Sequence, residues 1–282
     1  MFSLSKRARR LTIAAAGLGA LIALTGIAGP AVAGSGFPHT GTDKPTVVLV
    51  HGAWADGSSW DKVAARLQND GYRVDTPPNL LTGVSNDAAN LRAYLDTISG
   101  PIVLVGHSYG GMVITNAALG DKQVKALVYV DAYIPAKDDT VLSLTSAVPG
   151  SVFAAEPSTV FNQVAIPGAD PKVANLYVKP SVFGKAFADR SIPAKDVAVL
   201  AARQRPLASN ALVEASGEPA WRTIPSWSVI GKQDAVIPPA EQIAMSERAK
   251  AHTIEVNAPH LAMVTAPGVV TGQIEAAARA TD

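Results

Sequence analysis

The chain has 282 residues, with 24 Lys and Arg against 23 Asp and Glu, and it contains no cysteine. The absence of cysteine excludes disulfide bonds, a thiolate nucleophile and a Cys-ligated metal. A charge so close to balance gives no footprint for nucleic acid or for an anionic membrane surface. The length suffices for one α/β domain with a large core.

Residues 1–33 have the three parts of a secretory signal peptide. The four basic residues come first, an apolar stretch follows, and small residues form a cleavage pattern: Lys6, Arg7, Arg9 and Arg10, then Leu11 to Ile27, then Ala31-Val32-Ala33. We expect cleavage after Ala33 and a secreted or extracytoplasmic protein. The mature chain would carry 20 Lys and Arg against 23 Asp and Glu, a net charge of −3.

A transmembrane anchor is the alternative for this stretch, because its length approaches the about 18 residues that span a bilayer. Pro30 and the small residues after it favour cleavage, so no stable membrane insertion is expected afterwards. Arg9-Arg10 could belong to a twin-arginine export signal, although the residues that follow fit that pattern poorly. The sequence leaves the export route open.

After a Gly-, Ser- and Thr-rich leader at 34–44, strands and helices alternate. Short β-branched or apolar runs predict strands, and segments with 3.6-residue periodicity or helix-capping residues predict helices. In chain order they are a strand at 46–50, a helix at 58–70, a strand at 72–75, a helix at 85–99, a strand at 101–105, a helix at 112–119 and a strand at 124–130. This alternation predicts βαβ units and a parallel sheet.

The alternation stops over residues 137–219, which hold several Pro and Phe residues but no strong strand pattern. A structureless stretch of this length is improbable inside a compact domain, so we interpret it as a mostly helical cap over one end of the sheet. The rhythm then resumes with a strand at 226–230, a helix at 239–249, a strand at 253–256 and a helix from 269. Residues 45–282 are therefore predicted to form one domain with a cap insertion.

A Gly106-x-Ser108-x-Gly110 motif stands between a predicted strand and a predicted helix. This arrangement is typical of a nucleophile elbow, a tight turn that exposes a serine hydroxyl while the flanking glycines let neighbouring backbone approach. The motif alone would be weak, and its position between strand and helix makes it specific. We predict that Ser108 is a nucleophile.

A serine hydroxyl needs a base to take its proton. His260 follows a predicted strand and a short turn, and so lies at the sheet edge where catalytic groups gather. The other four histidines fit less well, being in the leader, at the end of the first strand, beside the serine and at the start of a strand: His39, His51, His107 and His252. We predict His260 as the base.

The acid that orients this histidine should lie at the end of a strand between Ser108 and His260 in the chain. Asp234 follows the strand at 226–230 and is the preferred candidate. Asp131, which ends the strand after the nucleophile helix, is the alternative.

An oxyanion requires two backbone N–H donors. The first is expected from Tyr109, the residue after the nucleophile, and the second from Ala53 in the loop after the first strand. Trp54 and Leu261 are predicted to line the substrate pocket.

Together these motifs resemble the small α/β-hydrolases, and in particular the branch of plant methyl-ester esterases and hydroxynitrile lyases with their bacterial relatives. The motifs are His51-Gly52-Ala53-Trp54, Gly106-His107-Ser108-Tyr109-Gly110-Gly111, Gly231-Lys232-Gln233-Asp234 and Pro259-His260. The resemblance implies an α/β-hydrolase fold with an eight-stranded, mostly parallel sheet and a Ser108-His260-Asp234 triad.

Two departures bear on the activity. The lyases of that branch carry threonine and lysine where this chain has Gly52 and Leu261, which disfavours lyase chemistry. Relatives that cleave halides or epoxides use an aspartate nucleophile, which Ser108 disfavours as well.

The sequence therefore predicts a serine hydrolase that cleaves a carboxylic ester of a small, largely apolar molecule, with no metal and no cofactor. Two alternatives stay open: hydrolysis of a carbon–carbon bond or a lactone by the same triad, and a non-catalytic protein that uses the fold to bind a small molecule. The oligomeric state does not follow from the sequence.

Overall fold

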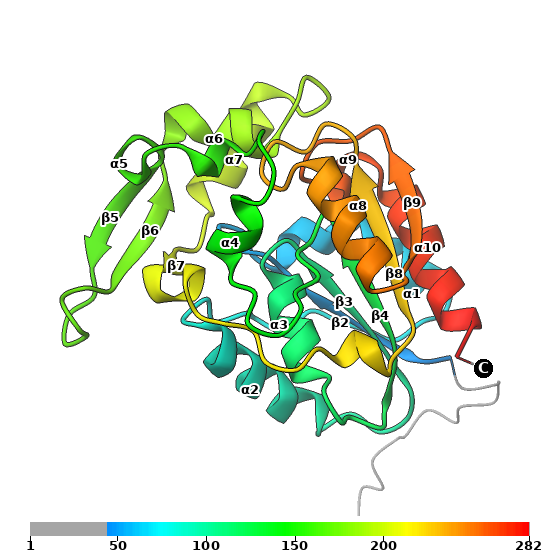
Figure 1. Cartoon of the computed structure of the whole chain (residues 1–282). Coiled ribbons are helices and arrows are strands. Elements are labelled where there is room, and N and C mark those ends of the chain that lie inside the picture. Colours follow the sequence, from blue (N-terminus) through cyan, green and yellow to red (C-terminus); the bar gives the residue numbers. More distant parts are fainter. Residues whose placement is uncertain (1–43, 282) are drawn as a thin grey trace, which may run out of the picture. The chain divides into compact units, whose positions relative to one another are not determined.

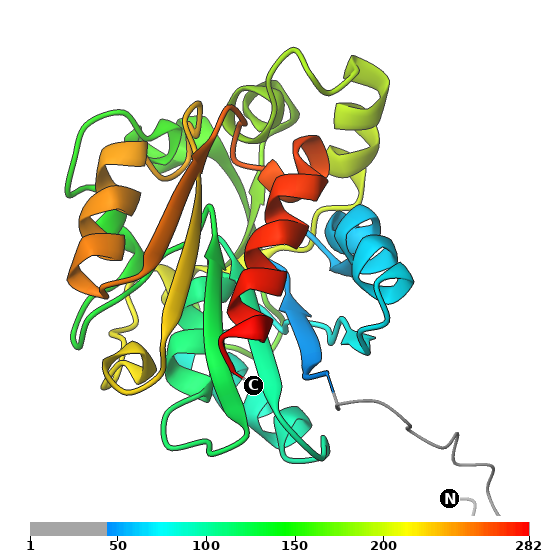
Figure 2. The same ribbon diagram turned by 90° about the vertical axis from the view of Figure 1, so that its right-hand side faces the viewer.

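The structure is a computed structural model, and it describes residues 44–281. The predicted signal peptide at 1–33 and the leader up to residue 43 lie outside the described residues. Within them, a central sheet of six strands has the order β2-β1-β3-β4-β8-β9, and every neighbouring pair is parallel (Figures 1 and 2). Its strands are β1 Thr46–Val50, β2 Val74–Asp75, β3 Ile102–His107, β4 Val124–Val130, β8 Ser226–Gly231 and β9 His252–Val256.

Helices cover both faces of this sheet, as a parallel sheet requires. α1 and α10 pack on one face, whereas α2, α3 and α8 pack on the other (Figures 1 and 2). The bounds are α1 Asp61–Asn69, α2 Val84–Leu95, α3 Gly110–Ala117, α8 Pro239–Arg248 and α10 Pro267–Arg279, with the short η1 Gly57–Trp60, η4 Ala220–Arg222 and α9 Ala262–Thr265. None of the helices described is both long and apolar enough to cross a bilayer.

The central strands are buried on both faces, which explains their continuous apolar sequences. All six residues of β3 and all five of β1 are buried, and the two strands pair in register from Thr46 with Ile102 to Val50 with Gly106. This burial contributes to the hydrophobic driving force for folding of the domain. It also fixes the carboxyl ends of β1 and β3 side by side, where the loops with Ala53 and Ser108 begin.

The α/β-hydrolase fold class is confirmed, but the main sheet has six strands and not the eight that the resemblance implies. Only Lys44 and Pro45 precede β1 within the described residues, so no strand lies before it there. β1 also has parallel partners on both sides, and its outer neighbour β2 is only two residues long. The remaining three strands of the described chain form a separate sheet.

That second sheet belongs to the insertion after β4, which covers the end of the main sheet where the strands finish (Figure 1). Its strands pair antiparallel in the order β5-β6-β7. The elements are α4 Val141–Thr145, η2 Val152–Ala154, α5 Pro157–Val160, β5 Phe161–Ala165, β6 Ala174–Val178, α6 Pro180–Phe187, α7 Ala194–Ala202, β7 Leu207–Ala208 and η3 Ser209–Leu212.

The prediction of a mostly helical cap therefore missed a β-hairpin. In β5 only Phe161 is buried and the next four residues are exposed, so the strand has no apolar alternation that a sequence could reveal. The turn before β6 contains Gly168 with φ of +81°, a conformation that glycine adopts without strain.

Candidate active site

Ser108 lies in a sharp turn between β3 and α3, and its φ of +52° is unusual for a residue with a side chain. The turn is possible because the glycines on either side of Ser108 let neighbouring backbone pack closely against it. A Cβ atom on Gly106 would lie 2.7 Å from the carbonyl oxygen of Gly110, and one on Gly110 would lie 2.7 Å from the carbonyl oxygen of Val50. Glycine at both positions lets β1, β3 and α3 meet beneath Ser108.

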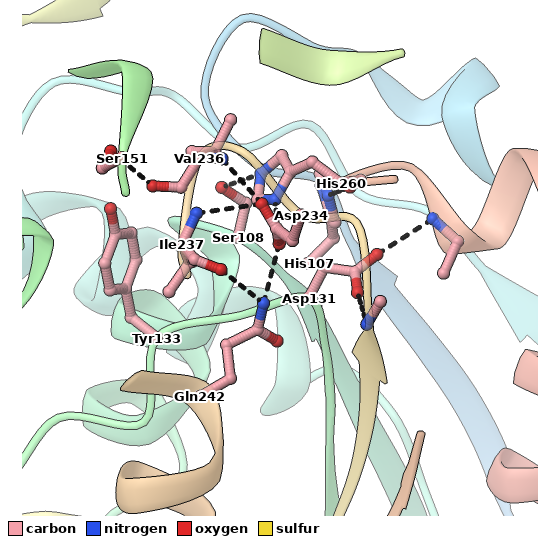
Figure 3. A network of polar contacts seen from close by, with 12 residues as sticks. His107, Ser108, Asp131, Tyr133, Ser151, Asp234, Val236, Ile237, Gln242 and His260 are labelled. Atoms are coloured by element: carbon pink, nitrogen blue, oxygen red, sulfur yellow. Dashed lines mark hydrogen bonds and ion pairs between the residues drawn. The ribbon is translucent and has the colours of Figure 1, made fainter. Parts of the chain in front are cut away.

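Three side chains from three strand ends meet at this turn (Figure 3). His260 Nε2 lies 2.9 Å from Ser108 Oγ, and His260 Nδ1 lies 2.7 Å from Asp234 Oδ2. His260 and the Asp234 carboxylate are shielded from solvent, and Ser108 is 3% exposed. The sequence-predicted serine, histidine and aspartate thus form one continuous hydrogen-bonded chain.

The Asp234 carboxylate is surrounded by donors. Its Oδ1 accepts hydrogen bonds from the backbone N–H groups of Val236 at 2.7 Å and Ile237 at 2.9 Å, and its Oδ2 accepts one from Gln242 Nε2 at 2.7 Å (Figure 3). Burial raises the pKa of Asp234, and these donated hydrogen bonds act in the opposite direction by stabilising the carboxylate. Together with His260 Nδ1 they fix the carboxylate in one orientation.

Burial lowers the pKa of His260 below its ordinary value, because the imidazolium form loses its hydration. The neutral imidazole is therefore the stable form at neutral pH. With Nδ1–H donated to Asp234, the lone pair on Nε2 faces the Ser108 hydroxyl and can accept its proton. This is the protonation state that a general base needs.

Asp131, the alternative acid, occupies a different place. It is fully buried and accepts hydrogen bonds from the backbone N–H of Gly231 at 2.7 Å and of Ala262 at 2.9 Å (Figure 3). Within residues 44–281 it makes no hydrogen bond to His260. Asp131 instead connects the end of β4 to the loops that carry Asp234 and His260.

The two predicted oxyanion donors flank the serine. Ala53 and Tyr109 line the same pocket as Ser108, and the backbone N–H of neither residue has a protein acceptor within the described part of the chain. The next residue, Trp54, has φ of +56° and donates its own N–H to the Arg205 carbonyl at 3.1 Å. The Tyr109 hydroxyl donates to Asp87 Oδ2 at 2.8 Å, which anchors this side chain away from the serine.

The family model of the alpha/beta hydrolase family matches residues 47–272, which include every residue of this site. The chain belongs to the alpha/beta hydrolase family.

Individual relatives agree with this assignment. The chain is 37% identical over 123 residues to the carbendazim hydrolyzing esterase of Nocardioides sp. (strain SG-4G), a match that covers 38% of this chain and 50% of that protein. It is 33% identical over 106 residues to methylesterase 10 of Arabidopsis thaliana, covering 32% of this chain and 38% of that protein. The matches span half or less of the length of these curated relatives. The predicted resemblance to plant methyl-ester esterases is confirmed.

The fold is also found among solved structures. The structure of polyneuridine aldehyde esterase superposes with a TM-score of 0.69 at 18% sequence identity, over 83% of this chain and 98% of that one. At this identity the likeness shows the fold.

The pocket of this hydrolase in front of Ser108 is lined mostly by apolar side chains. Its walls come from the core and from the cap, and they include Trp54, Tyr133, Val141, Thr145, Phe153, Phe161, Leu207, Leu212 and Val236. Trp54 stacks on Phe161 with ring centroids 5.4 Å apart, and it meets Phe153 edge-on at 4.9 Å. Trp54, predicted to line the substrate pocket, lies in the wall of the pocket that contains Ser108.

Leu261 lies elsewhere. It lines a neighbouring pocket together with Phe183, Phe187 and Leu200. Trp54 borders both pockets and so separates them. Within residues 44–281, no group of three or more His, Cys, Asp or Glu side chains is arranged to hold a metal ion.

Sequence reasoning missed the part that His107 plays. Its Nε2 lies 2.8 Å from the backbone carbonyl oxygen of His260 and donates to it, and the two rings lie 4.8 Å apart. Its place beside Ser108 in the motif gave no sign of this contact, because the partner is 153 residues away in the chain. Of the other histidines, His51 Nε2 accepts the backbone N–H of Asn79 at 3.0 Å, His252 is exposed, and His39 lies outside the described residues.

Proposed function

We propose that this alpha/beta hydrolase is a serine esterase that cleaves a carboxylic ester of a small, largely apolar molecule. The observation that carries the proposal is the continuous hydrogen-bonded chain Ser108–His260–Asp234, which ends in an apolar pocket. Beside it lie two backbone N–H groups, of Ala53 and Tyr109, that have no acceptor among residues 44–281. A protein that only bound a small molecule would have no chemical need for this complete set of groups.

In the first half of the reaction, Ser108 Oγ attacks the ester carbonyl carbon while its proton passes to His260 Nε2. The carbonyl oxygen becomes an oxyanion and accepts hydrogen bonds from the backbone N–H groups of Ala53 and Tyr109. Asp234 holds the imidazole in its Nδ1–H tautomer and stabilises the imidazolium that forms.

The tetrahedral intermediate then collapses. The bond between the carbonyl carbon and the alcohol oxygen breaks, and that oxygen takes the proton from His260 Nε2, which leaves an acyl group on Ser108. A water molecule reverses the sequence: His260 takes its proton, the hydroxide attacks the acyl carbon, and the carboxylic acid leaves as Ser108 recovers its proton.

The relatives support an ester as the substrate, since two of them are named as a carbendazim hydrolyzing esterase and a methylesterase. The site also has no room for a threonine at position 52, where the lyases of the resembling branch carry one. A Cβ atom on Gly52 would lie 2.7 Å from Ser108 Cβ and 2.9 Å from the His107 carbonyl oxygen. This crowding favours ester hydrolysis over lyase chemistry.

We further propose that the enzyme acts outside the cytoplasm, because residues 1–33 have the pattern of a signal peptide. The test is the intact mass of the protein recovered from the periplasm or culture medium of a host that expresses the full chain. A chain that begins at Gly34 supports the proposal, and a full-length chain that stays in the cytoplasm contradicts it.

Hydrolysis of p-nitrophenyl esters from acetate to decanoate tests the esterase directly. The mature protein should turn over these esters with a dependence on chain length, and Ser108→Ala and His260→Ala should each lose at least about 1,000-fold in kcat/KM. A folded wild-type protein that hydrolyses none of them, or a Ser108→Ala variant that keeps its activity, would contradict the proposal.

A further inference from the structure

A pair of hydroxyl groups stands in the wall of the Ser108 pocket. Tyr133 follows β4 by three residues, and Thr145 is the last residue of α4. Tyr133 OH lies 2.7 Å from Thr145 Oγ1, and both side chains are buried. Tyr133 is also attached to the nucleophile turn, since its backbone N–H donates to the Ser108 carbonyl at 3.3 Å.

The proton of each hydroxyl can be assigned from the neighbouring contacts. Thr145 Oγ1 lies 2.7 Å from the backbone carbonyl oxygen of Val141, one helical turn earlier. A carbonyl oxygen can only accept, so Thr145 must give its single proton to Val141. Tyr133 must then give its own proton to Thr145 Oγ1. The Tyr133 oxygen has no proton left to offer the pocket, and it keeps a lone pair with which it can accept one.

The pocket that Tyr133 lines suits the acyl half of an ester. It contains Ser108 and both expected oxyanion donors, Ala53 and Tyr109. The leaving alcohol must instead lie against His260, which protonates it. The neighbouring pocket is on that side, because it is lined by Leu261 and by Phe187, whose ring lies 5.5 Å from the His260 ring.

We propose that Tyr133 is a specificity-determining residue which selects esters whose acyl group carries a hydrogen-bond donor, an O–H or N–H on the carbon chain, as in hydroxy acids and N-substituted amino acids. This inference rests on the proposed esterase function. A donor on the acyl group can bond to the remaining lone pair of the Tyr133 oxygen. An apolar acyl group excludes water from that lone pair and offers it no hydrogen bond. An acyl group with only acceptors, such as an ether oxygen, faces it lone pair to lone pair.

The test compares phenyl esters of hexanoic, 2-hydroxyhexanoic and 3-hydroxyhexanoic acid with the methyl ethers of the two hydroxy acids. One buried hydrogen bond is worth about 1 to 1.5 kcal/mol, which corresponds to roughly 10-fold in kcat/KM. We expect the better hydroxy ester to exceed both hexanoate and its own methyl ether by about 10-fold. Equal rates for all three would overturn the inference.

Two tyrosine variants show whether Tyr133 is the source of this preference. Tyr133→Phe should reduce the ratio of hydroxy ester to hexanoate to about one. Tyr129→Phe is the matched control: Tyr129 OH pairs with Thr115 Oγ1 at 2.8 Å, Thr115 donates to the Gly111 carbonyl at 2.7 Å, and neither residue lines the pocket. The control should keep the 10-fold ratio, and a Tyr133→Phe variant that also keeps it would overturn the inference.

Thr145→Val supplies an independent test through the proton assignment. Without the threonine oxygen, the Tyr133 proton loses its acceptor and becomes available to the pocket. The preference for the hydroxy ester over its methyl ether should then fall from about 10-fold to about one or reverse. An unchanged preference would show that Tyr133 does not face the substrate as an acceptor.

The result separates this inference from the proposed function. Esters that are hydrolysed without regard to the hydroxyl group overturn the acceptor role of Tyr133 and leave the esterase intact. A folded protein that hydrolyses no ester and is not labelled by a fluorophosphonate at Ser108 overturns both.

Discussion

At the scale of single residues, His260 is held by three contacts that together determine its chemistry. Its ring nitrogens meet Asp234 and Ser108, and its backbone carbonyl accepts a hydrogen bond from His107. The ring is also completely shielded from solvent. The position and the protonation state of the His260 ring are thus set before a substrate binds. Such preorganisation means that the site needs little rearrangement during the reaction.

The lowered pKa of His260 predicts the pH dependence of the activity. A base is active when it is unprotonated, and a pKa below 6.5 keeps His260 neutral as the pH falls through that value. We expect kcat/KM, which reports the free enzyme, to stay level from about pH 8 to below pH 6.5 and to fall only at more acidic pH. An acid limb centred above 6.5 in a pH–rate profile would contradict the burial argument.

His107 is predicted to be a positioning residue for His260. His107→Leu removes the donor and leaves the buried His260 carbonyl unpaired, which costs about 1 to 3 kcal/mol. Because His260 can shift to relieve this cost, we expect kcat to fall by roughly 10- to 100-fold. His107→Gln can place an amide N–H near the position of Nε2 and should recover kcat to within about 3-fold of wild type.

Steady-state kinetics of both variants check this prediction. If His107 acted only through packing, the leucine and glutamine variants would lose activity to the same degree, and the donor role would be wrong.

At the scale of elements, the sequence predicted what is locally encoded. The strands at 46–50 and 124–130 have the predicted bounds because their apolar runs are buried and end at clear turns. The contacts among Ser108, His260 and Asp234 could be predicted because the elbow motif and the loop positions of Asp234 and His260 are features of chain order. The contacts of His107, Asp131 and Tyr133 could not, because each depends on a partner that only the folded chain brings near.

Substitution by alanine is predicted to have opposite effects at Gly106, in the turn around Ser108, and at Gly272, in α10. In Gly106→Ala the new Cβ would lie 2.7 Å from the backbone oxygen of Gly110, which cannot shift without moving Ser108. We expect a loss of about 1 to 3 kcal/mol in the free energy of unfolding, together with reduced activity.

Gly272→Ala is the matched control. Gly272 lies in the middle of α10, and a Cβ there would have open space around it. It should raise the free energy of unfolding by about 0.5 to 1 kcal/mol, because alanine favours the helix. Urea denaturation measures both changes, and a Gly106→Ala variant as stable as the wild type would refute the packing argument.

At the scale of the whole domain, the cap is joined to the hydrolase core through Trp54. Its indole N–H donates to the Leu176 carbonyl in β6 at 2.8 Å, its backbone N–H donates to the Arg205 carbonyl, and its ring packs on Phe153 and Phe161. Since Trp54 directly follows Ala53, the same residue couples the cap to the expected oxyanion donor. The cap thus contributes to the shape of the pocket and to the geometry of the loop that carries Ala53.

This coupling predicts the effect of two substitutions at position 54. Trp54→Ala removes a large buried ring and should lower the free energy of unfolding by about 3 to 5 kcal/mol. Trp54→Phe keeps most of the ring packing but loses the bond to Leu176, and should lower it by about 1 kcal/mol beyond any repacking. Urea denaturation of both variants checks the order. An alanine variant whose free energy of unfolding lies within about 1 kcal/mol of the wild type, roughly the contribution of one hydrogen bond, would show that the cap is held by other contacts.

The central claim is that Ser108 is a nucleophile activated by His260, and covalent labelling tests it most directly. The mature protein is treated with a fluorophosphonate, and the adduct is located by intact mass and peptide mapping. We predict one adduct per chain on Ser108, none in Ser108→Ala, and labelling slowed at least about 100-fold in His260→Ala. Labelling at another residue, or equal rates in the wild type and His260→Ala, would contradict the account.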